Sequence, residues 1–128
     1  MLIKRGNMHF PRCYHAMGYI NKMDINKTED LIVATGSKYP ESSSRTCEYY
    51  DVWKNEWKQL PELNQARHYH SVSIIQDENT STWVYVIGGR SSDESPLDSI
   101  ERLNFDECRG QALENARGWE LLEIRNVD

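Results

Sequence analysis

The chain has 128 residues, of which 38% are hydrophobic and 27% are charged, and its net charge is −5 at pH 7. This length and composition are typical of one globular domain. The acidic charge argues against a nucleic-acid partner, because phosphate contacts require a concentrated basic surface. The longest apolar runs, Leu31–Ala34 and Val84–Ile87, are far shorter than the roughly 20 residues that cross a bilayer. We therefore expect a soluble protein with no membrane partner.

The cysteines and the N-terminus indicate an intracellular protein. Cys13, Cys47 and Cys108 cannot all pair within one chain, and their spacing matches no zinc or redox motif. The basic residues near the N-terminus are not followed by an apolar segment, so no secretory signal is expected. We expect reduced cysteines, a cytoplasmic location and no cofactor.

Eight short segments rich in β-branched and aromatic residues alternate with polar loops along the chain. In order they are Cys13–Ile20, Leu31–Thr35, Thr46–Tyr50, Glu56–Leu60, His70–Ile75, Trp83–Ile87, Ser99–Phe105 and Trp119–Ile124. Short strands separated by turn signals are typical of an all-β fold. Helical spacing occurs only between Glu107 and Arg117, where one or two turns are expected. The runs Leu31–Thr35 and Val84–Ile87 are apolar at every position, which predicts strands covered on both faces.

The eight segments form two copies of one ordered pattern. The first copy carries Arg12, His15, Gly36, Glu48, Tyr50, Asp51, Asn55, Trp57 and Leu60. The second copy carries Arg67, His70, Ser71, Gly88, Gly89, Glu101, Trp119 and Leu122. A repeated unit of this size usually cannot bury its own apolar face and needs neighbouring units to do so.

This ordered set resembles the Kelch repeat, a four-stranded blade of a β-propeller. The resemblance implies an all-β fold made of two four-stranded antiparallel Kelch-type blades of an incomplete β-propeller. Residues 1–9 would form a lead-in, 10–63 the first blade, 64–124 the second blade and 125–128 a C-terminal tail. The residues expected to be structural in this pattern are Gly36, Trp57, Gly88, Gly89 and Trp119, the glycines for sharp exits with positive φ and the tryptophans for packing between blades.

The second copy departs from the first by an insertion between its last two strands. Asp51 and Trp57 are six positions apart, whereas their counterparts Asn104 and Trp119 are fifteen apart. The extra residues lie near 108–117, and we expect them to form a protruding loop. Smaller departures are Ser37 after Gly36, where the pattern has a second glycine, and Leu103 where it has tyrosine.

The sequence contains no motif that favours catalysis. His68 and His70 lie at alternate positions and in a strand would point to the same side, as a metal site requires, but no carboxylate or third histidine is placed to complete a site. Asp93 and Glu94 lie in a polar loop and are expected to be solvated. We expect no enzyme activity and no bound metal.

Two alternative functions remain. Because some propellers that resemble this family are copper oxidases, the chain could be a non-catalytic piece of an oxidase-like enzyme. The other alternative is a purely structural subunit of a large complex.

Protein binding is the favoured function. In Kelch propellers the ligand face is commonly built by loops that join the second strand to the third and one blade to the next. The resemblance places Ser37–Arg45, Arg90–Asp98 and the segment 62–69 on that face. The candidate binding residues are Lys38, Tyr39, Arg45, Arg67, His68, Tyr69 and Arg90. Arginine and tyrosine often anchor protein interfaces, and a cationic, aromatic rim predicts a protein–protein interaction or scaffold module with an acidic peptide as its candidate partner.

The number of repeats raises a separate question. A closed propeller has about 4 to 8 blades, and two blades leave two outer faces bare. The chain would therefore be a fragment of a longer propeller, would be completed by other propeller blades or by copies of itself, or would stand alone as a two-sheet domain. We expect the isolated chain to be oligomeric, bound to a partner or poorly folded.

Overall fold

The computed structural model describes residues 6–24, 27–109 and 111–123 and shows an all-β molecule with two four-stranded sheets. The first sheet contains β1 (Ala16–Asp24), β2 (Lys27–Thr35), β3 (Cys47–Asp51) and β4 (Glu56–Leu60). The second contains β5 (Ser71–Gln76), β6 (Thr82–Ile87), β7 (Ser99–Asn104) and β8 (Glu120–Glu123). The predicted tail at 125–128 and the first five residues of the predicted lead-in lie outside the described residues.

In each sheet the strands lie side by side in the order in which they occur along the chain. Every neighbouring pair of strands is antiparallel. The predicted all-β fold with two four-stranded antiparallel sheets is therefore confirmed. We call the sheet β1–β4 blade 1 and the sheet β5–β8 blade 2. Short helical turns occur at η1 (Glu41–Ser43), α1 (Phe105–Cys108) and η2 (Leu113–Asn115). No helix in the described ranges has the length and apolar character needed to cross a membrane.

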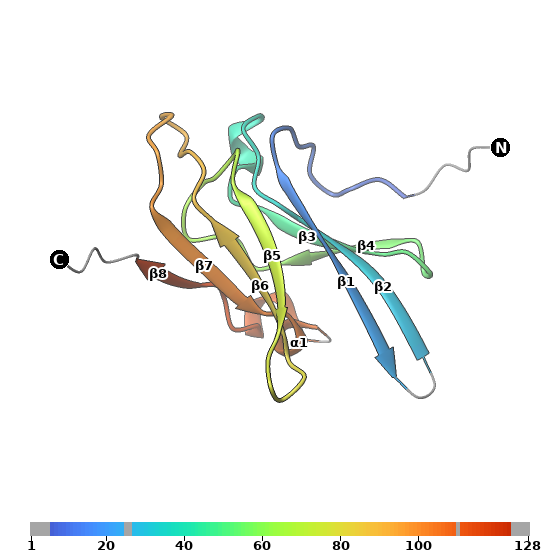
Figure 1. The fold of residues 1–128 in the computed structure, drawn as a ribbon. Helices are drawn as coiled ribbons and strands as arrows, with labels where there is room; N and C mark the ends of the chain where they lie inside the picture. The colour runs from blue at the N-terminus through green and yellow to red at the C-terminus, as the bar shows by residue number, and fades with distance from the viewer. Residues whose placement is uncertain (1–5, 25–26, 110, 124–128) are drawn as a thin grey trace.

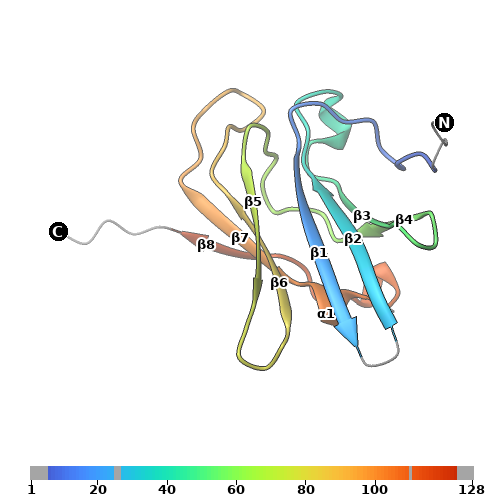
Figure 2. The ribbon, with the colours of Figure 1, turned by 45° about the vertical axis from the view of Figure 1, so that its right-hand side comes forward.

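The two blades stack with β1 beside β5, as Figures 1 and 2 show. The approach is close because β1 carries Gly18 at the contact. A β-carbon at this position would lie 2.7 Å from Cγ1 of Val72 and 3.0 Å from Cδ1 of Ile74. A larger side chain at this position would therefore require Val72 and Ile74 to move.

One hydrophobic core runs through both blades. Blade 1 contributes the inward-facing residues Ile20, Leu31, Val33, Cys47, Tyr49 and Leu60, and blade 2 contributes Val84, Val86, Leu103 and Trp119. Alternation along each strand produces this arrangement, since successive side chains point to opposite faces of a sheet. The blades therefore share their buried apolar area and do not have two separate cores.

The outer face of blade 2 differs from the prediction. Val84 and Val86 of β6 are buried against blade 1, but Ile87 is 38% exposed and Trp83 and Tyr85 are only partly buried. The prediction that the Val84–Ile87 run is covered on both faces is thus wrong within this chain. Among the residues that the structure describes, no third sheet covers the apolar residues on the second face of β6.

The insertion near 108–117, predicted to be a protruding loop, begins at the end of the buried turn α1. Phe105 and Cys108 of α1 are buried in the shared core, and the Phe105 ring packs edge-on against Tyr49 of blade 1 at 5.0 Å. Arg109 pairs with Glu29 of β2, with Nη1 donating to Oε1 at 2.8 Å. Only the later part of the insertion, around η2, is mainly exposed. The turn α1 and the start of the insertion at Arg109 therefore join the two blades.

A buried ion pair fixes the segment that connects the blades. The Arg67 Nε atom donates to Oε2 of Glu101 at 3.2 Å, and neither side chain is exposed to solvent. Glu101 also accepts the backbone N–H groups of Asn64 at 2.6 Å and Gln65 at 3.1 Å. The indole of Trp119 donates to the carbonyl of Pro61 at 2.8 Å.

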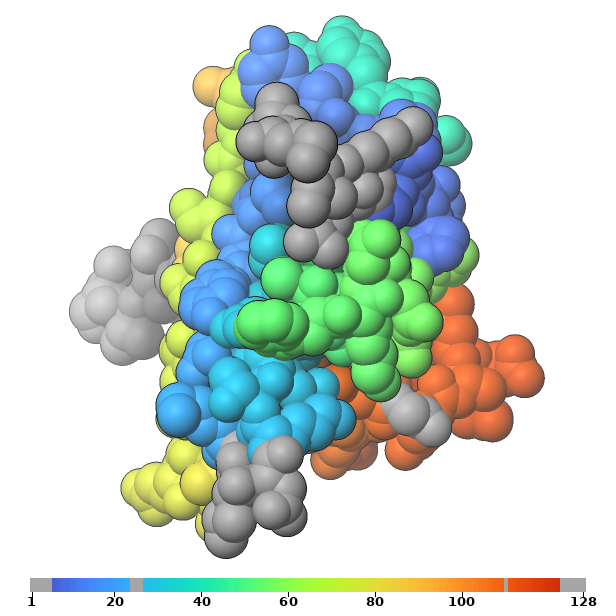
Figure 3. Space-filling view, turned by 90° about the vertical axis from the view of Figure 1, so that its right-hand side faces the viewer, coloured from blue at the N-terminus to red at the C-terminus, as the bar shows by residue number. Residues whose placement is uncertain are grey.

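The segment before β1 repeats this arrangement on blade 1. Arg12 Nη2 donates to Glu48 Oε2 at 3.0 Å, again with neither side chain exposed. Glu48 accepts the backbone N–H groups of His9 at 2.8 Å and Phe10 at 3.2 Å, and the indole of Trp57 donates to Gly6 at 3.0 Å. Figure 3 shows the dark-blue N-terminal segment along this side of blade 1. The predicted lead-in therefore contributes residues 6–9 to the repeat itself.

Candidate functional site

Four loops meet at the end of the molecule where β1 and β5 begin and β2 and β6 end, at the top of Figure 1. They bring together Tyr14, Lys38, Tyr39, Tyr69 and Glu94, which we call the tyrosine patch. Backbone hydrogen bonds join the loops, because Lys38 donates its N–H to Cys13 at 2.9 Å and Tyr69 donates to Tyr14 at 3.0 Å. The patch thus lies across the junction of the two blades.

The aromatic rings of the patch surround one ammonium group. The Nζ atom of Lys38 lies 5.5 Å from the ring centroids of Tyr14 and Tyr39 and 5.8 Å from that of Tyr69. The Tyr14 and Tyr69 rings contact each other with centroids 4.6 Å apart. Yet Tyr14 and Tyr69 are each 52% exposed and Tyr39 is 63% exposed. The rings contact one another and Lys38 on one side and are open to solvent on the other.

Tyr14 and Tyr69 both have a backbone conformation that tyrosine rarely adopts. Each has φ of 54°, in the left-handed region that bulky residues avoid because the β-carbon approaches the following carbonyl group. The two positions are 55 residues apart and occupy the same place in the repeat. This conformation occurs immediately before each blade begins its first strand, and it turns both rings to the same end of the molecule.

Glu94 is the acidic member of the patch. Its Oε1 atom lies 3.7 Å from Lys38 Nζ and 3.0 Å from His68 Nε2. Desolvation alone would raise the pKa of Glu94, but His68, Lys38 and Arg90 beside it hold this pKa below the ordinary value. Partial burial alone would lower the pKa of Lys38, but Glu94 and the surrounding tyrosines raise it. Both groups are therefore charged at neutral pH.

The structure groups five of the seven predicted binding residues. Lys38, Tyr39 and Tyr69 belong to the patch, and His68 lies beneath it. Arg90 lies next to the patch, since its backbone exchanges hydrogen bonds with His68 and its Nη1 atom donates to the carbonyl of Glu94 at 3.0 Å. The predicted loops Ser37–Arg45 and Arg90–Asp98 supply most of this surface.

Two of the predicted binding residues have other roles. Arg67 has no exposed surface, and its guanidinium is occupied by Glu101, Gly88 and Ser99. The prediction that Arg67 contacts a binding partner at the surface is therefore wrong, because the side chain is buried. Arg45 is exposed, but its Nε atom donates to the carbonyl of Leu63 at 2.8 Å and the side chain is not a member of the patch.

Sequence reasoning missed two members of the patch. Tyr14 could have been found, because it stands at the position of the repeat that corresponds to Tyr69. Glu94 was expected to be a solvated loop residue, and nothing in its local sequence signals its contacts with Lys38 and His68. Those contacts join loops of different blades and depend on the packing of the sheets.

The predicted structural glycines all have positive φ, with 68° at Gly36, 65° at Gly88 and 90° at Gly89. Gly36 also permits a close approach of the loops beneath the patch. A β-carbon there would lie 2.7 Å from Cε1 of His70. Glycine at this position therefore lets the two blades meet directly below the tyrosine rings.

His70 is buried below the patch. The Nε2 atom of His70 lies 2.7 Å from Oγ1 of Thr35. Burial, together with the charge of Arg67, lowers the pKa of His70 to about 4, so its ring is neutral at physiological pH. Within residues 6–24, 27–109 and 111–123, no three histidine, cysteine, aspartate or glutamate side chains are grouped to hold a metal ion.

Comparison with known proteins gives one similarity that agrees with the repeat. No family model matches the chain. Over 81 residues, or 62% of its length, the chain is 25% identical to the Kelch repeat and BTB domain-containing protein 2 of cowpox virus (strain GRI-90 / Grishak). The match covers 14% of that protein. The chain is thus similar in part to a protein with Kelch repeats, and its two four-stranded sheets agree with that similarity.

Proposed function

We propose that this chain is a protein-interaction module of the Kelch type that binds a segment of another protein through the tyrosine patch. The observation that carries the proposal is the arrangement of Tyr14, Tyr39 and Tyr69, three half-exposed rings from three loops around one cation. Exposed tyrosines with a fixed position are well suited to binding, because they offer a large contact area and lose little conformational entropy. The proposed role is non-catalytic.

The charges of the patch favour a partner segment with an acidic side chain. Lys38 and Arg90 supply positive charge, and Glu94 already places a carboxylate between Lys38 and His68. In the proposed complex, a carboxylate of the partner takes the place of Glu94 beside Lys38, while apolar groups of the partner pack on the rings. Glu94 would then act as an internal competitor for the acidic partner.

The proposal can be tested with fluorescein-labelled peptides that carry one tyrosine flanked by glutamates, each matched by a peptide with glutamine in place of glutamate. We expect the glutamate peptides to bind more tightly. Tyr69→Ala and Lys38→Met should each weaken binding by about 30-fold, as loss of a central interface residue does, whereas Glu94→Gln should strengthen it. Arg45→Ala, a matched exposed cation outside the patch, should leave binding unchanged.

Fluorescence anisotropy measures these affinities directly. Equal affinity for the glutamate and glutamine peptides would contradict the acidic partner. Binding that is equally sensitive to Arg45→Ala and Lys38→Met would contradict the patch as the binding site.

A further inference from the structure

Three loops direct nitrogen donors toward one acidic residue of the tyrosine patch, Glu94. Its Oε1 atom lies 3.7 Å from Nζ of Lys38 and 3.0 Å from Nε2 of His68. Arg90 contacts the backbone of the same residue, because its Nη1 atom donates to the carbonyl of Glu94 at 3.0 Å. Lys38 follows β2, His68 precedes β5 and Arg90 follows β6, so the packing of the blades assembles this group.

The side chain of Glu94 fills this place without satisfying the groups around it. The closest approach of both Lys38 and His68 is to the same oxygen atom, Oε1, and the 3.7 Å distance to Lys38 is longer than a hydrogen bond. The Glu94 side chain is 47% exposed, and its backbone has a φ of 68°, which glutamate rarely adopts. Glu94 is therefore held at the edge of the group and is not enclosed by it.

His68 is the buried member of the group. The residue is only 2% exposed, and its ring packs against that of Tyr69 with centroids 5.1 Å apart. Within the described residues, its buried Nε2 atom makes no hydrogen bond of ordinary geometry, although Glu94 is near it. Buried side-chain nitrogen atoms normally have a hydrogen-bond partner, and an exception indicates a place for a further group. An acceptor oxygen placed better than Oε1 of Glu94 would satisfy a protonated Nε2.

We propose that the acidic group bound beside Lys38 is a phosphate, carried by a phosphorylated serine in a segment of the protein partner. This inference rests on the proposed function, because it specifies the partner of the tyrosine patch. When the Glu94 side chain is displaced, Lys38 and Arg90 present two positive charges, and a phosphate ester carries a charge of about −1.5 to −2 at neutral pH. A phosphate also has one more free oxygen than a carboxylate, so it can accept from Lys38, His68 and Arg90 together.

The length of the Glu94 side chain favours phosphoserine over phosphotyrosine. The phosphorus atom of phosphoserine is as many bonds from its α-carbon as the carboxyl carbon of glutamate is from its own. A phosphoserine of the partner therefore replaces Glu94 with a group of equal reach and greater charge. The half-exposed rings of Tyr14, Tyr39 and Tyr69 then remain free to contact the partner residues beside the phosphoserine.

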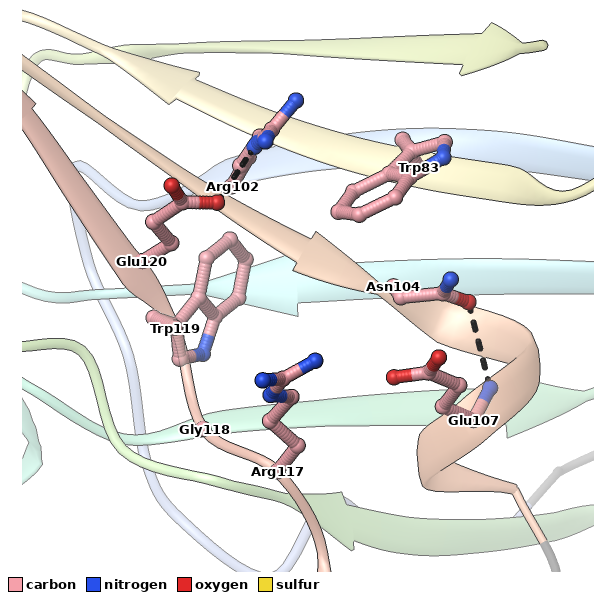
Figure 4. A pocket seen from close by; sticks show the side chains of 8 residues that line it. All are labelled: Trp83, Arg102, Asn104, Glu107, Arg117, Gly118, Trp119 and Glu120. Atoms are coloured by element: carbon pink, nitrogen blue, oxygen red, sulfur yellow. Dashed lines mark hydrogen bonds and ion pairs between the residues drawn. The ribbon is translucent and has the colours of Figure 1, made fainter.

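A second concave region of the molecule lacks these features. Figure 4 shows a hollow of about 710 Å³ on blade 2, whose lining includes Trp83, Trp119, Arg102, Arg117, Glu107 and Glu120. Arg102 donates to Glu120 at 2.7 Å, a full hydrogen bond. Because the arginines and glutamates of this lining are equal in number, we expect no preference for phosphate there. Arg117, an exposed arginine of the hollow, provides a matched control for Arg90.

The test uses the full chain and fluorescein-labelled peptides of one sequence that contains a tyrosine. One position of the peptide is phosphoserine, glutamate or serine, and the rest is unchanged. Fluorescence anisotropy should show that the phosphoserine peptide binds at least about 10-fold more tightly than the glutamate peptide, because it forms charge-assisted hydrogen bonds that the carboxylate lacks. The serine peptide should bind most weakly. Free O-phosphoserine should compete at least about 100-fold more weakly than the phosphopeptide, because it makes no contact with the rings.

Substitutions locate the phosphate. His68→Gln and Arg90→Gln should each lower the preference for phosphoserine over glutamate from about 10-fold to about 2-fold or less, since each removes a donor that the phosphate uses. Arg90 is exposed, so Arg90→Gln serves where His68→Gln lowers stability. Lys38→Met should weaken both peptides, because Lys38 contacts either anion. Arg117→Gln should change neither affinity.

The outcomes separate this inference from the proposed function. Equal affinity of the phosphoserine and glutamate peptides would overturn the phosphate site, as would an unchanged preference in both His68→Gln and Arg90→Gln. Competition by free O-phosphoserine as strong as that of the phosphopeptide would overturn the protein segment as the ligand. In each of these cases the proposed function still stands if Lys38→Met and Tyr69→Ala weaken binding of the glutamate peptide. Failure of every peptide to bind would overturn both proposals.

Discussion

Two buried arginine–glutamate pairs hold the blades to the segments that precede them. Arg12 with Glu48 and Arg67 with Glu101 have no exposed side-chain surface, and each carboxylate also accepts two backbone N–H groups. A buried charge is tolerated only when its partners are complete. These pairs are therefore sensitive positions, because removing one partner leaves the other charge buried alone.

Arg67→Met should lower the free energy of unfolding by about 3 to 5 kcal/mol, since Glu101 would lose its counter-charge in a site without solvent. Arg45→Ala is the matched control, because it removes an exposed arginine of the preceding loop and should change stability by less than about 0.5 kcal/mol. Urea unfolding followed by tryptophan fluorescence measures both. Equal effects of the two substitutions would show that burial of the pair is not important for stability.

His70 should make the stability depend on pH. Burial, with Arg67, His15 and His68 nearby, lowers the pKa of His70 from 6.5 to about 4, so the unfolded chain binds a proton that the folded chain excludes. This contribution is fully present above pH 6.5 and is lost as the pH falls toward 4, with a slope approaching about 1.4 kcal/mol per pH unit. His70→Gln should reduce the slope of the unfolding free energy over this interval, and an unchanged slope would contradict the assignment.

Among the elements, α1 is the one whose role is least visible in the sequence. It has only four residues, yet it carries Phe105 and Cys108 into the core and is followed by Arg109, which pairs with Glu29 of the other blade. The N-terminus of α1 is capped by Asn104, whose side chain accepts the N–H of Glu107 at 3.2 Å. This turn thus joins blade 2 to blade 1 at the end opposite the tyrosine patch.

Phe105→Ala should destabilise the chain by about 3 to 5 kcal/mol, because it leaves a cavity between the blades against Tyr49. Leu113→Ala, in the exposed turn η2 of the insertion that follows α1, should cost less than about 0.5 kcal/mol. The denaturant midpoints of the two variants compare the contribution of α1 with that of η2. A similar loss of stability in both variants would contradict the greater importance of α1.

The positions of the strands could be predicted because each carries its own local signal. Every expected strand segment overlaps an observed strand, and the glycines after β2 and β6 have the positive φ that the turns required. The burial of Arg67 could not be predicted in this way, since arginine is usually exposed and its partner Glu101 is 34 residues away. The contacts of Glu94 and Phe105 were missed for the same reason, because they exist only after the blades pack.

At the scale of the whole molecule, the shared core predicts that the two blades unfold together. Ile20 and Leu31 of blade 1 belong to the same buried cluster as Val84 and Leu103 of blade 2. Far-ultraviolet circular dichroism and tryptophan fluorescence should therefore report one transition with the same midpoint. Gly18→Val, which disturbs the contact between β1 and β5, should shift both signals equally. Two separate transitions would show that each sheet is stable on its own.

The left-handed backbone at Tyr14 and Tyr69 has a consequence for how this chain would respond to selection. Glycine adopts φ of 54° without the steric cost that a tyrosine bears. A library selected only for thermal stability should therefore accumulate glycine or asparagine at both positions, whereas a library selected for partner binding should retain the aromatic rings. The two positions thus mark where folding and recognition make opposite demands on the same residue.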